Sequence, residues 1–209
     1  MEVGSVNLTS AVLSLSLLTI AVRGVANEVP AKPHVTINVY NDAGISEQVL
    51  AQAEQEATRI FHKAGVENVW VECRLWKPDP DRSSRCQAPV GPTLLALRIV
   101  PRSSKLRDSV FGIAFLSAEG EGTYTDVFYV SVEKLHRDFH ANLSRVLGDV
   151  MAHEIGHLLL GTNAHSAVGI MRPQWQGPEL RSIGMGTFLF TPEQARTMGD
   201  KLLFLKARN

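Results

Sequence analysis

Three histidines and a glutamate stand close together between residues 150 and 171, in the stretch VMAHEIGHLLLGTNAHSAVGIM. His153 and His157 are four positions apart, so on a helix both imidazoles project from one face and can share a metal ion. Glu154 lies about 100° further round such a helix than His153. A carboxylate placed there stands beside the ion and suits a general base that acts on water. Imidazole ligands with a carboxylate neighbour favour Zn²⁺ over Ca²⁺ or Mg²⁺.

The helix that would carry these residues is otherwise apolar. Two histidines and a glutamate inside such a helix would be costly to bury unless they are paired or coordinate a metal. A surface helix with two chance histidines is therefore the weaker interpretation. The apolar positions are Val146, Leu147, Val150, Met151, Ile155, Leu158, Leu159 and Leu160.

A catalytic zinc site usually has three protein ligands and one open position, so a third ligand is needed. His165 is the first candidate, because Gly161 can adopt a left-handed backbone conformation and turn the chain back toward the metal. Glu179 is the alternative and would give a site of two histidines and a carboxylate. Asn163 is a poor zinc ligand.

In this order the residues resemble the HExxHxxGxxH signature of the metzincin clan of zinc metallopeptidases, which is followed by a methionine turn. Gly169–Met171 is similar to that turn, and the His165–Ser166 pair resembles the matrixins, with small bacterial matrixin-like proteins as the nearest likeness. The spacing differs from the family, which places glycine three and the last histidine six residues after the second histidine. Here Gly161 is four and His165 eight residues after His157, and Asn163 occupies the usual ligand position.

The resemblance implies a zinc endopeptidase in which His153, His157 and His165 hold Zn²⁺ and Glu154 is the general base. Met171 would lie beneath the metal, and a protein or peptide substrate would lie extended along an edge strand near residues 111–116. No tyrosine follows Met171, so the tyrosine that stabilises the transition state in some metzincins is absent. The implied fold is α+β: a twisted, mainly parallel five-stranded sheet with an antiparallel edge strand, an active-site helix, a methionine turn and a C-terminal helix.

A non-catalytic, zinc-stabilised module that is exported and binds peptides or partners is the alternative of a different class. Glu154 argues against it, because a purely structural zinc site has no use for a base and normally fills all four positions with protein ligands.

The hydrophobic periodicity predicts the elements that must position the site. Strands are expected at 34–41, 69–76, 94–101, 109–117 and 125–132. Helices are expected from Ser46 to Gly65, from Asn142 to Gly161, and from Thr191 to about Ala207, each beginning at a capping residue. The stretch 172–190 reads as irregular, although Trp175 within it is a candidate wall for a substrate pocket. Glu119 and Glu121 are expected in a turn rather than in a calcium site.

The N-terminal region predicts export. Residues 11–22 carry no charge and precede Gly24-Val25-Ala26, which is typical of a signal peptide over residues 1–26 that leaves 27–209 as one catalytic domain. A buried helix is the alternative, since Glu2 precedes the run and no Lys or Arg does. A run of this length falls short of the roughly 20 residues that span a bilayer, so no stable membrane insertion is expected after the signal is removed. We expect a secreted or periplasmic protein.

Composition and cysteine content agree with such a protein. The 209 residues fit one domain, and 21 basic residues balance 21 acidic ones, so no nucleic-acid surface is expected. We expect a monomer. Cys73 and Cys86 predict a disulfide, because two thiolates on a metal would need further ligands close by. The remaining histidines, His34, His62, His136 and His140, are expected at the surface or at helix ends.

Overall fold

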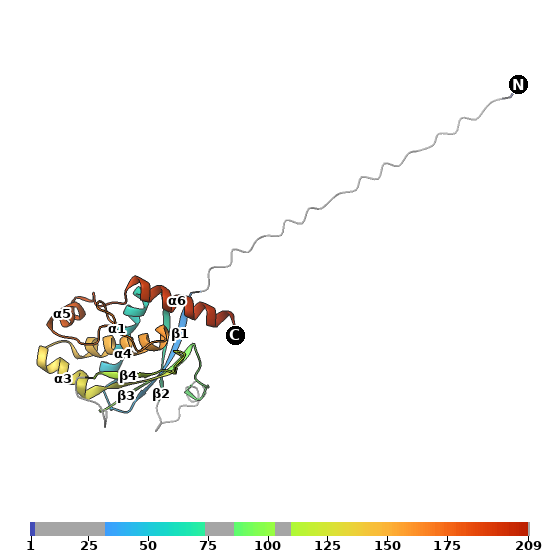
Figure 1. Ribbon diagram of the computed structural model, residues 1–209. Helices are drawn as coiled ribbons and strands as arrows, with labels where there is room; N and C mark the ends of the chain where they lie inside the picture. Colours follow the sequence, from blue (N-terminus) through green and yellow to red (C-terminus); the bar gives the residue numbers. More distant parts are fainter. Residues whose placement is uncertain (3–31, 74–85, 103–109, 209) are drawn as a thin grey trace. The chain divides into compact units, whose positions relative to one another are not determined.

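The structure is a computed structural model that describes residues 1–2, 32–73, 86–102 and 110–208. All its helices and strands lie in the compact unit Ala31–Asn209 (Figure 1). The predicted signal peptide lies outside the described residues, apart from Met1 and Glu2. No helix in the described part of the chain has the length and apolar character needed to cross a membrane.

In the described part of the chain, five strands form one sheet in the order β2-β1-β3-β5-β4. Strands β2, β1, β3 and β5 are parallel neighbours, whereas β4 runs antiparallel to β5 at the edge. The structure therefore confirms the predicted α+β class with a mainly parallel sheet and an antiparallel edge strand. The strands are β1 (His34–Asn41), β2 (Glu67–Cys73), β3 (Leu94–Val100), β4 (Gly112–Phe115) and β5 (Tyr124–Phe128).

The antiparallel edge follows from a short connection. The chain between β4 and β5 turns at Ser117–Glu121, where Ser117 donates its backbone N–H to the Glu121 carbonyl and Gly120 has a φ of 78°. A turn of this length can join only antiparallel neighbours, because a parallel pair needs a crossover. Glu119 and Glu121 lie in this turn, as predicted.

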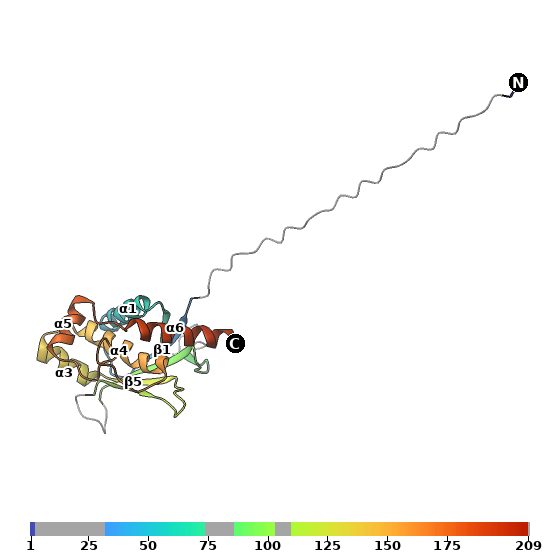
Figure 2. The same ribbon diagram turned by 45° about the horizontal axis from the view of Figure 1, so that its top comes forward.

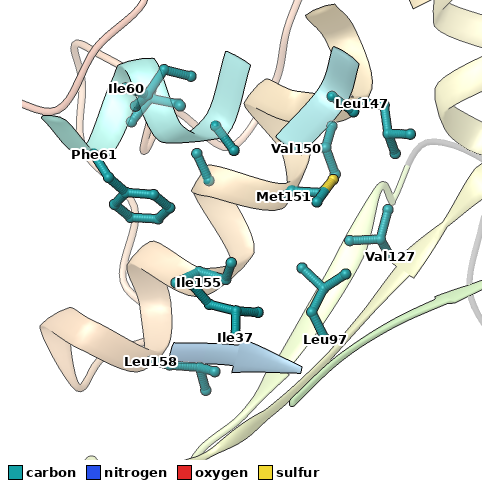
Figure 3. Packing of buried hydrophobic residues seen from close by; sticks show 14 of the residues in the cluster. Ile37, Ile60, Phe61, Leu97, Val127, Leu147, Val150, Met151, Ile155 and Leu158 are labelled. Atoms are coloured by element: carbon teal, nitrogen blue, oxygen red, sulfur yellow. The ribbon is translucent and has the colours of Figure 1, made fainter. Parts of the chain in front are cut away.

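Helices α1 (Glu47–Lys63) and α4 (Leu143–Leu160) form the hydrophobic core with one face of the sheet. Figure 3 shows Met151, Ile155 and Leu158 of α4 close to strand residues Ile37 and Leu97. Both helices begin as predicted: the Ser46 side chain accepts from the Val49 N–H, and the Asn142 side chain accepts from the Arg145 N–H.

Helix α4 is enclosed by protein along most of its length. All but three of its eighteen residues are buried, including His153, Glu154 and His157. A β-carbon added at Gly148 would lie 2.5 Å from the Ala53 carbonyl oxygen and 2.8 Å from Cβ of Glu56, both on α1. Gly148 therefore allows α1 and α4 to approach more closely than any other residue would.

One helix that the sequence did not predict follows β5 directly. The strand expected over 125–132 ends at Phe128, and α3 (Tyr129–Phe139) begins at the next residue. The aromatic and β-branched residues there favour a strand locally, but Val132 and Leu135 are spaced for one face of a helix and are buried. His136 hydrogen-bonds the Ala141 carbonyl, and His140 ends the helix in a left-handed conformation, so both lie near its end as predicted.

The stretch expected to be irregular contains another helix, α5 (Gly177–Met185). Its low helix propensity, with Gly177, Pro178 and Gly184, hides it from a periodicity search. The missed signal is Gln176, whose backbone N–H donates to Glu179 Oε2 at 2.9 Å, as in a capping box. Helix α6 (Pro192–Ala207) is capped by Thr191, as predicted. Helices α3 and α5 lie at the end of the unit opposite the C-terminus (Figure 2).

Besides β5, strands β2 and β4 have boundaries that differ from prediction by more than one residue. Strand β2 starts at Glu67 rather than 69, and residues 74–76 of the predicted strand lie outside the described residues. Strand β4 is confined to Gly112–Phe115, and Ser109 of the predicted strand is likewise undescribed. The predicted disulfide between Cys73 and Cys86 is present, with their Cα atoms 5.7 Å apart.

Two glycine substitutions separate packing from helix propensity. We expect Gly148→Ala to lower the free energy of unfolding by about 1–3 kcal/mol, because the new methyl group meets the α1 backbone. Gly199→Ala in α6 is the control: its added carbon meets only Pro33 Cγ at 3.6 Å. It is expected to raise stability by up to about 1 kcal/mol through propensity alone. Urea denaturation measures both, and stabilisation by Gly148→Ala would contradict this account of the α1–α4 contact.

Candidate metal centre and cleft

His153 and His157 occupy successive turns of α4 with their rings toward each other. Their Nε2 atoms are 3.1 Å apart, and the two rings are nearly perpendicular. The Nδ1 of His153 is 2.7 Å from the Ile170 carbonyl oxygen, and the Nδ1 of His157 is 2.8 Å from the Thr162 carbonyl oxygen. Since a carbonyl only accepts, each Nδ1 carries the proton.

This tautomer leaves both Nε2 atoms as acceptors that face each other inside the protein. Two lone pairs at 3.1 Å repel unless a cation lies between them. Tetrahedral zinc with bonds of about 2.0–2.1 Å places two nitrogen ligands about 3.3–3.4 Å apart, close to this separation. The donor set and its backbone hydrogen bonds therefore fit a zinc ion.

His165 lies beside the other two imidazoles. Its ring centroid is 5.4 Å from that of His153 and 5.0 Å from that of His157, and the candidate ligand atoms of all three lie within 4.8 Å of one another. Gly161, with a φ of 71°, ends α4 in a left-handed conformation. The Ala164 N–H then donates to Thr162 Oγ1, in a turn just before His165.

The longer spacing is accommodated at the helix end. The residue added before the glycine continues α4 as far as Leu160, and the one added after it is taken up by the turn at Thr162. The loop thereby returns His165 to the metal-binding face of α4.

The alternative ligands occupy other positions. Glu179 begins α5, where its carboxylate accepts from the Gln176 N–H and forms an ion pair with Arg172 Nη1 at 2.9 Å. Among the described residues, the group with metal-ligand geometry consists of the three histidines and does not include Glu179. Asn163 is exposed and lines the cleft beside the histidines.

Glu154 is buried between α4 and the edge strand. A β-carbon at Gly112 of β4 would lie 2.6 Å from both Cγ and Cδ of Glu154, and also 2.6 Å from the Asp126 carbonyl oxygen. Gly112 is therefore the residue that makes room for the Glu154 side chain against β4. The carboxyl group also lines the cleft that contains the histidines, so it can reach a water molecule or a substrate there.

The predicted methionine turn packs against the same helix. Met171 is buried, and a β-carbon added at Gly156 of α4 would lie 2.9 Å from its sulfur. The preceding residue, Ile170, supplies the carbonyl oxygen that binds His153. Gly169 has a φ of 72°, which a glycine adopts without strain. The turn therefore holds the first histidine in place through the backbone.

A cleft of about 260 Å³ lies in front of the histidines. Trp175 forms part of its wall, as the sequence suggested: its ring is 5.7 Å from that of His153 and 5.6 Å from that of Phe111. The Trp175 indole N–H donates to the Arg172 carbonyl oxygen at 3.1 Å. The cleft is lined by Val110, Phe111, Gly112, Ile113, Ala114, Val150, His153, Glu154, His157, Asn163, His165, Arg172, Pro173 and Trp175.

Burial sets the protonation of the site. Burial, with a smaller contribution from His157, lowers the pKa of His153 to about 3. It also lowers the pKa values of His157 and His165. The three rings are therefore neutral near pH 7, as metal ligands must be. Burial raises the pKa of Glu154 to about 8, which favours the proton-bearing form of this carboxyl group.

The sequence did not reveal the contributions of Gly112, Phe111 and Arg172 as individual residues. Gly112 and Phe111 belong to the segment expected to bind substrate, but the close approach of Glu154 depends on the packing of α4 against β4. Arg172 follows Met171 directly. Its place in the cleft depends on Glu179 of α5, a helix that the sequence did not predict.

No protein-family model matches the chain, and no curated protein does. Among solved structures, the chain is similar to a zinc-dependent peptidase from Methanocorpusculum labreanum, with 17% sequence identity and a TM-score of 0.52 over 78% of this chain and 99% of the other. It is also similar to archaemetzincin from Methanopyrus kandleri, with 16% sequence identity and a TM-score of 0.48; the match covers 84% of this chain and 99% of the other. At 17% identity the first similarity is one of fold: the chain has a fold found in a zinc-dependent peptidase. The particular likeness to matrixins stays a prediction.

Zinc binding tests the choice of third ligand. We expect His165→Ala to weaken zinc affinity by at least about ten-fold. Loss of a residue that only hydrogen-bonds a metal ligand typically costs this much, and loss of a ligand itself should cost no less. Asn163→Ala, which alters the residue at the usual family position, is expected to leave the affinity unchanged. Competition with a fluorescent chelator gives both values. Equal affinities for the two variants would show that His165 is not a ligand.

Proposed function

We propose that this protein is an exported zinc-dependent endopeptidase. The observation that carries the proposal is the pair of deprotonated Nε2 atoms of His153 and His157 facing each other, with the Glu154 carboxyl group beside them in an open cleft. His165 completes a set of three neutral imidazoles. Three protein ligands and a space for water are typical of catalytic rather than structural zinc.

The residues of the chain have distinct tasks in this proposal. When bound, Zn²⁺ supplies a Lewis acid that lowers the pKa of water and of a nearby carboxyl group and polarises a carbonyl oxygen. The Glu154 carboxylate accepts a proton from the attacking water and then donates it to the nitrogen of the leaving amine. Ile170 and Thr162 keep the ligand histidines in the correct tautomer through their carbonyl groups.

The substrate is proposed to lie extended beside β4. Among the described strands, β4 has β5 as its only neighbour, so within this part of the chain its other edge is available to a further strand. Gly112, Ile113 and Ala114 of β4 line the cleft directly. A peptide that adds to this edge gains backbone hydrogen bonds that do not depend on its sequence. It also passes close to Glu154.

The base is tested by removing its charge. Glu154→Gln is expected to retain zinc but to lower kcat for a casein-derived peptide by about 10²- to 10⁴-fold, the usual contribution of a general base. The matched control is Glu193→Gln, which removes an exposed carboxylate on α6 and should keep full activity.

Two outcomes would contradict the proposal. Full activity of Glu154→Gln would exclude the assigned base. A wild-type protein that binds zinc tightly but hydrolyses no peptide, with or without a chelator, would instead support the non-catalytic binding module.

Export is also part of the proposal, with residues 1–26 as a signal peptide. The uncharged run 11–22 supports it, and so does the disulfide between Cys73 and Cys86, because disulfides persist mainly in oxidising compartments.

Expression of the whole chain in a bacterium, followed by fractionation and N-terminal sequencing, tests export. We expect extracytoplasmic protein that begins near Asn27 and contains no free thiol. Deletion of residues 11–22 is the control and should retain the protein in the cytoplasm. Wild-type protein found only in the cytoplasm with Met1 intact would refute export.

A further inference from the structure

Among the described residues that line the cleft, one carries a permanent positive charge. Apart from the three histidines and Glu154, Arg172 is the only ionisable residue among the described residues that line it. The Arg172 side chain is 44% exposed, so its guanidinium group is open to solvent and to a bound molecule. No part of the proposed hydrolysis uses this residue.

The guanidinium group is held in place from behind. Its Nη1 is 2.9 Å from Glu179 Oε1, and the Glu179 side chain is only 8% exposed. The other oxygen, Oε2, accepts from the Gln176 N–H at the start of α5. In the described part of the chain Glu179 is the only ion-pair partner of Arg172. Because a guanidinium has five N–H donors, one anchored nitrogen leaves others able to bind a ligand.

The backbone of Arg172 belongs to the turn that supports His153. Two residues earlier, Ile170 accepts the hydrogen bond from His153, and the Arg172 carbonyl accepts from Trp175 in the cleft wall. Arg172 is therefore held at both ends. Its backbone belongs to the turn that supports His153, and its Nη1 is bound to Glu179 of α5. A group positioned in this way loses little conformational freedom when it binds a ligand.

We propose that Arg172 forms a carboxylate-binding subsite of the cleft. This inference rests on the proposed function and deepens it: the preferred substrates are peptides that carry a carboxylate near the scissile bond. The carboxylate comes either from an acidic side chain or from the C-terminus of the peptide. A planar guanidinium binds it through charge-assisted hydrogen bonds, which are stronger than neutral ones.

Matched peptides test the subsite and identify the source of the carboxylate. One series places Glu or Gln at each of the three positions on either side of the scissile bond, and a second pair differs only in a C-terminal acid or amide. We expect the wild type to prefer the carboxylate member of one pair by about ten-fold in kcat/KM, as one charge-assisted hydrogen bond provides. The pair that shows the preference identifies the source.

Substitutions assign the preference to Arg172. In Arg172→Gln the ratio of kcat/KM within that pair is expected to fall to about one, and in Arg172→Glu it should fall below one. Arg172→Lys should restore part of the preference, because it keeps the charge but not the planar fork. The control is Arg181→Gln, which removes the same charge from a residue of α5 that does not line the cleft. It should leave the ratio unchanged.

A second variant distinguishes loss of the subsite from misfolding. Loss of Arg172 leaves the buried Glu179 carboxylate without its ion pair. The double variant Arg172→Gln/Glu179→Gln removes that charge as well, and the amide oxygen introduced at position 179 can still accept from the Gln176 N–H. Zinc content and Tm verify that each variant is folded. The double variant should show the same ratio near one as the single variant.

Binding without turnover separates this inference from the proposed function. In Glu154→Gln, calorimetry is expected to give a Kd about ten-fold lower for the carboxylate peptide than for its neutral partner, and this difference should vanish when Arg172→Gln is added. This result would support the subsite even if the wild type hydrolysed no peptide. No preference in either assay, or a preference that survives in folded Arg172→Gln, would overturn the subsite.

Discussion

The structure depends on the burial of α4, a helix that carries polar residues at positions largely shielded from water. His153 and His157 meet this constraint by donating their Nδ1 protons to the carbonyl groups of Ile170 and Thr162. These carbonyls belong to the segment that follows α4, so the same bonds that satisfy the histidines also fix the path of the chain beyond the helix. The turn at Gly169–Met171 and the cleft wall are placed as a consequence.

Three glycines allow other elements to approach α4 or its glutamate. Gly148 admits α1, and Gly156 admits Met171 and Phe190, while Gly112 on β4 admits the Glu154 side chain. At each position an added β-carbon would lie 2.5–2.7 Å from the nearest atom. These close contacts leave no room for a larger residue at the three positions, so substitutions there would act on the site indirectly.

Metal binding and substrate selection share one short segment in our proposals. Residues 169–175 bind His153 through a backbone carbonyl, bury Met171 beside α4, present Arg172 to the cleft and place Trp175 in its wall. A movement of this segment would change both the first ligand and the subsite. Glu179 resists such movement, since it holds Arg172 from the start of α5. Glu179, the alternative third ligand in the sequence, is thus bound to Arg172 and to the start of α5 instead.

The sequence by itself determined the features that depend on local geometry. The four-residue spacing of His153 and His157 implies a shared face on any helix, and alternation or capping residues located β1, α1, α4 and α6. Only the tertiary structure showed that His165, and not Glu179, lies beside His153 and His157, because this depends on where a loop of irregular backbone ends in space. It also revealed α3 and α5, whose local signals are weak or favour a strand, and it placed Gly112 and Arg172, whose partners lie far away in sequence. Periodicity describes a residue's neighbours within one element, whereas contacts between elements depend on how the whole chain packs.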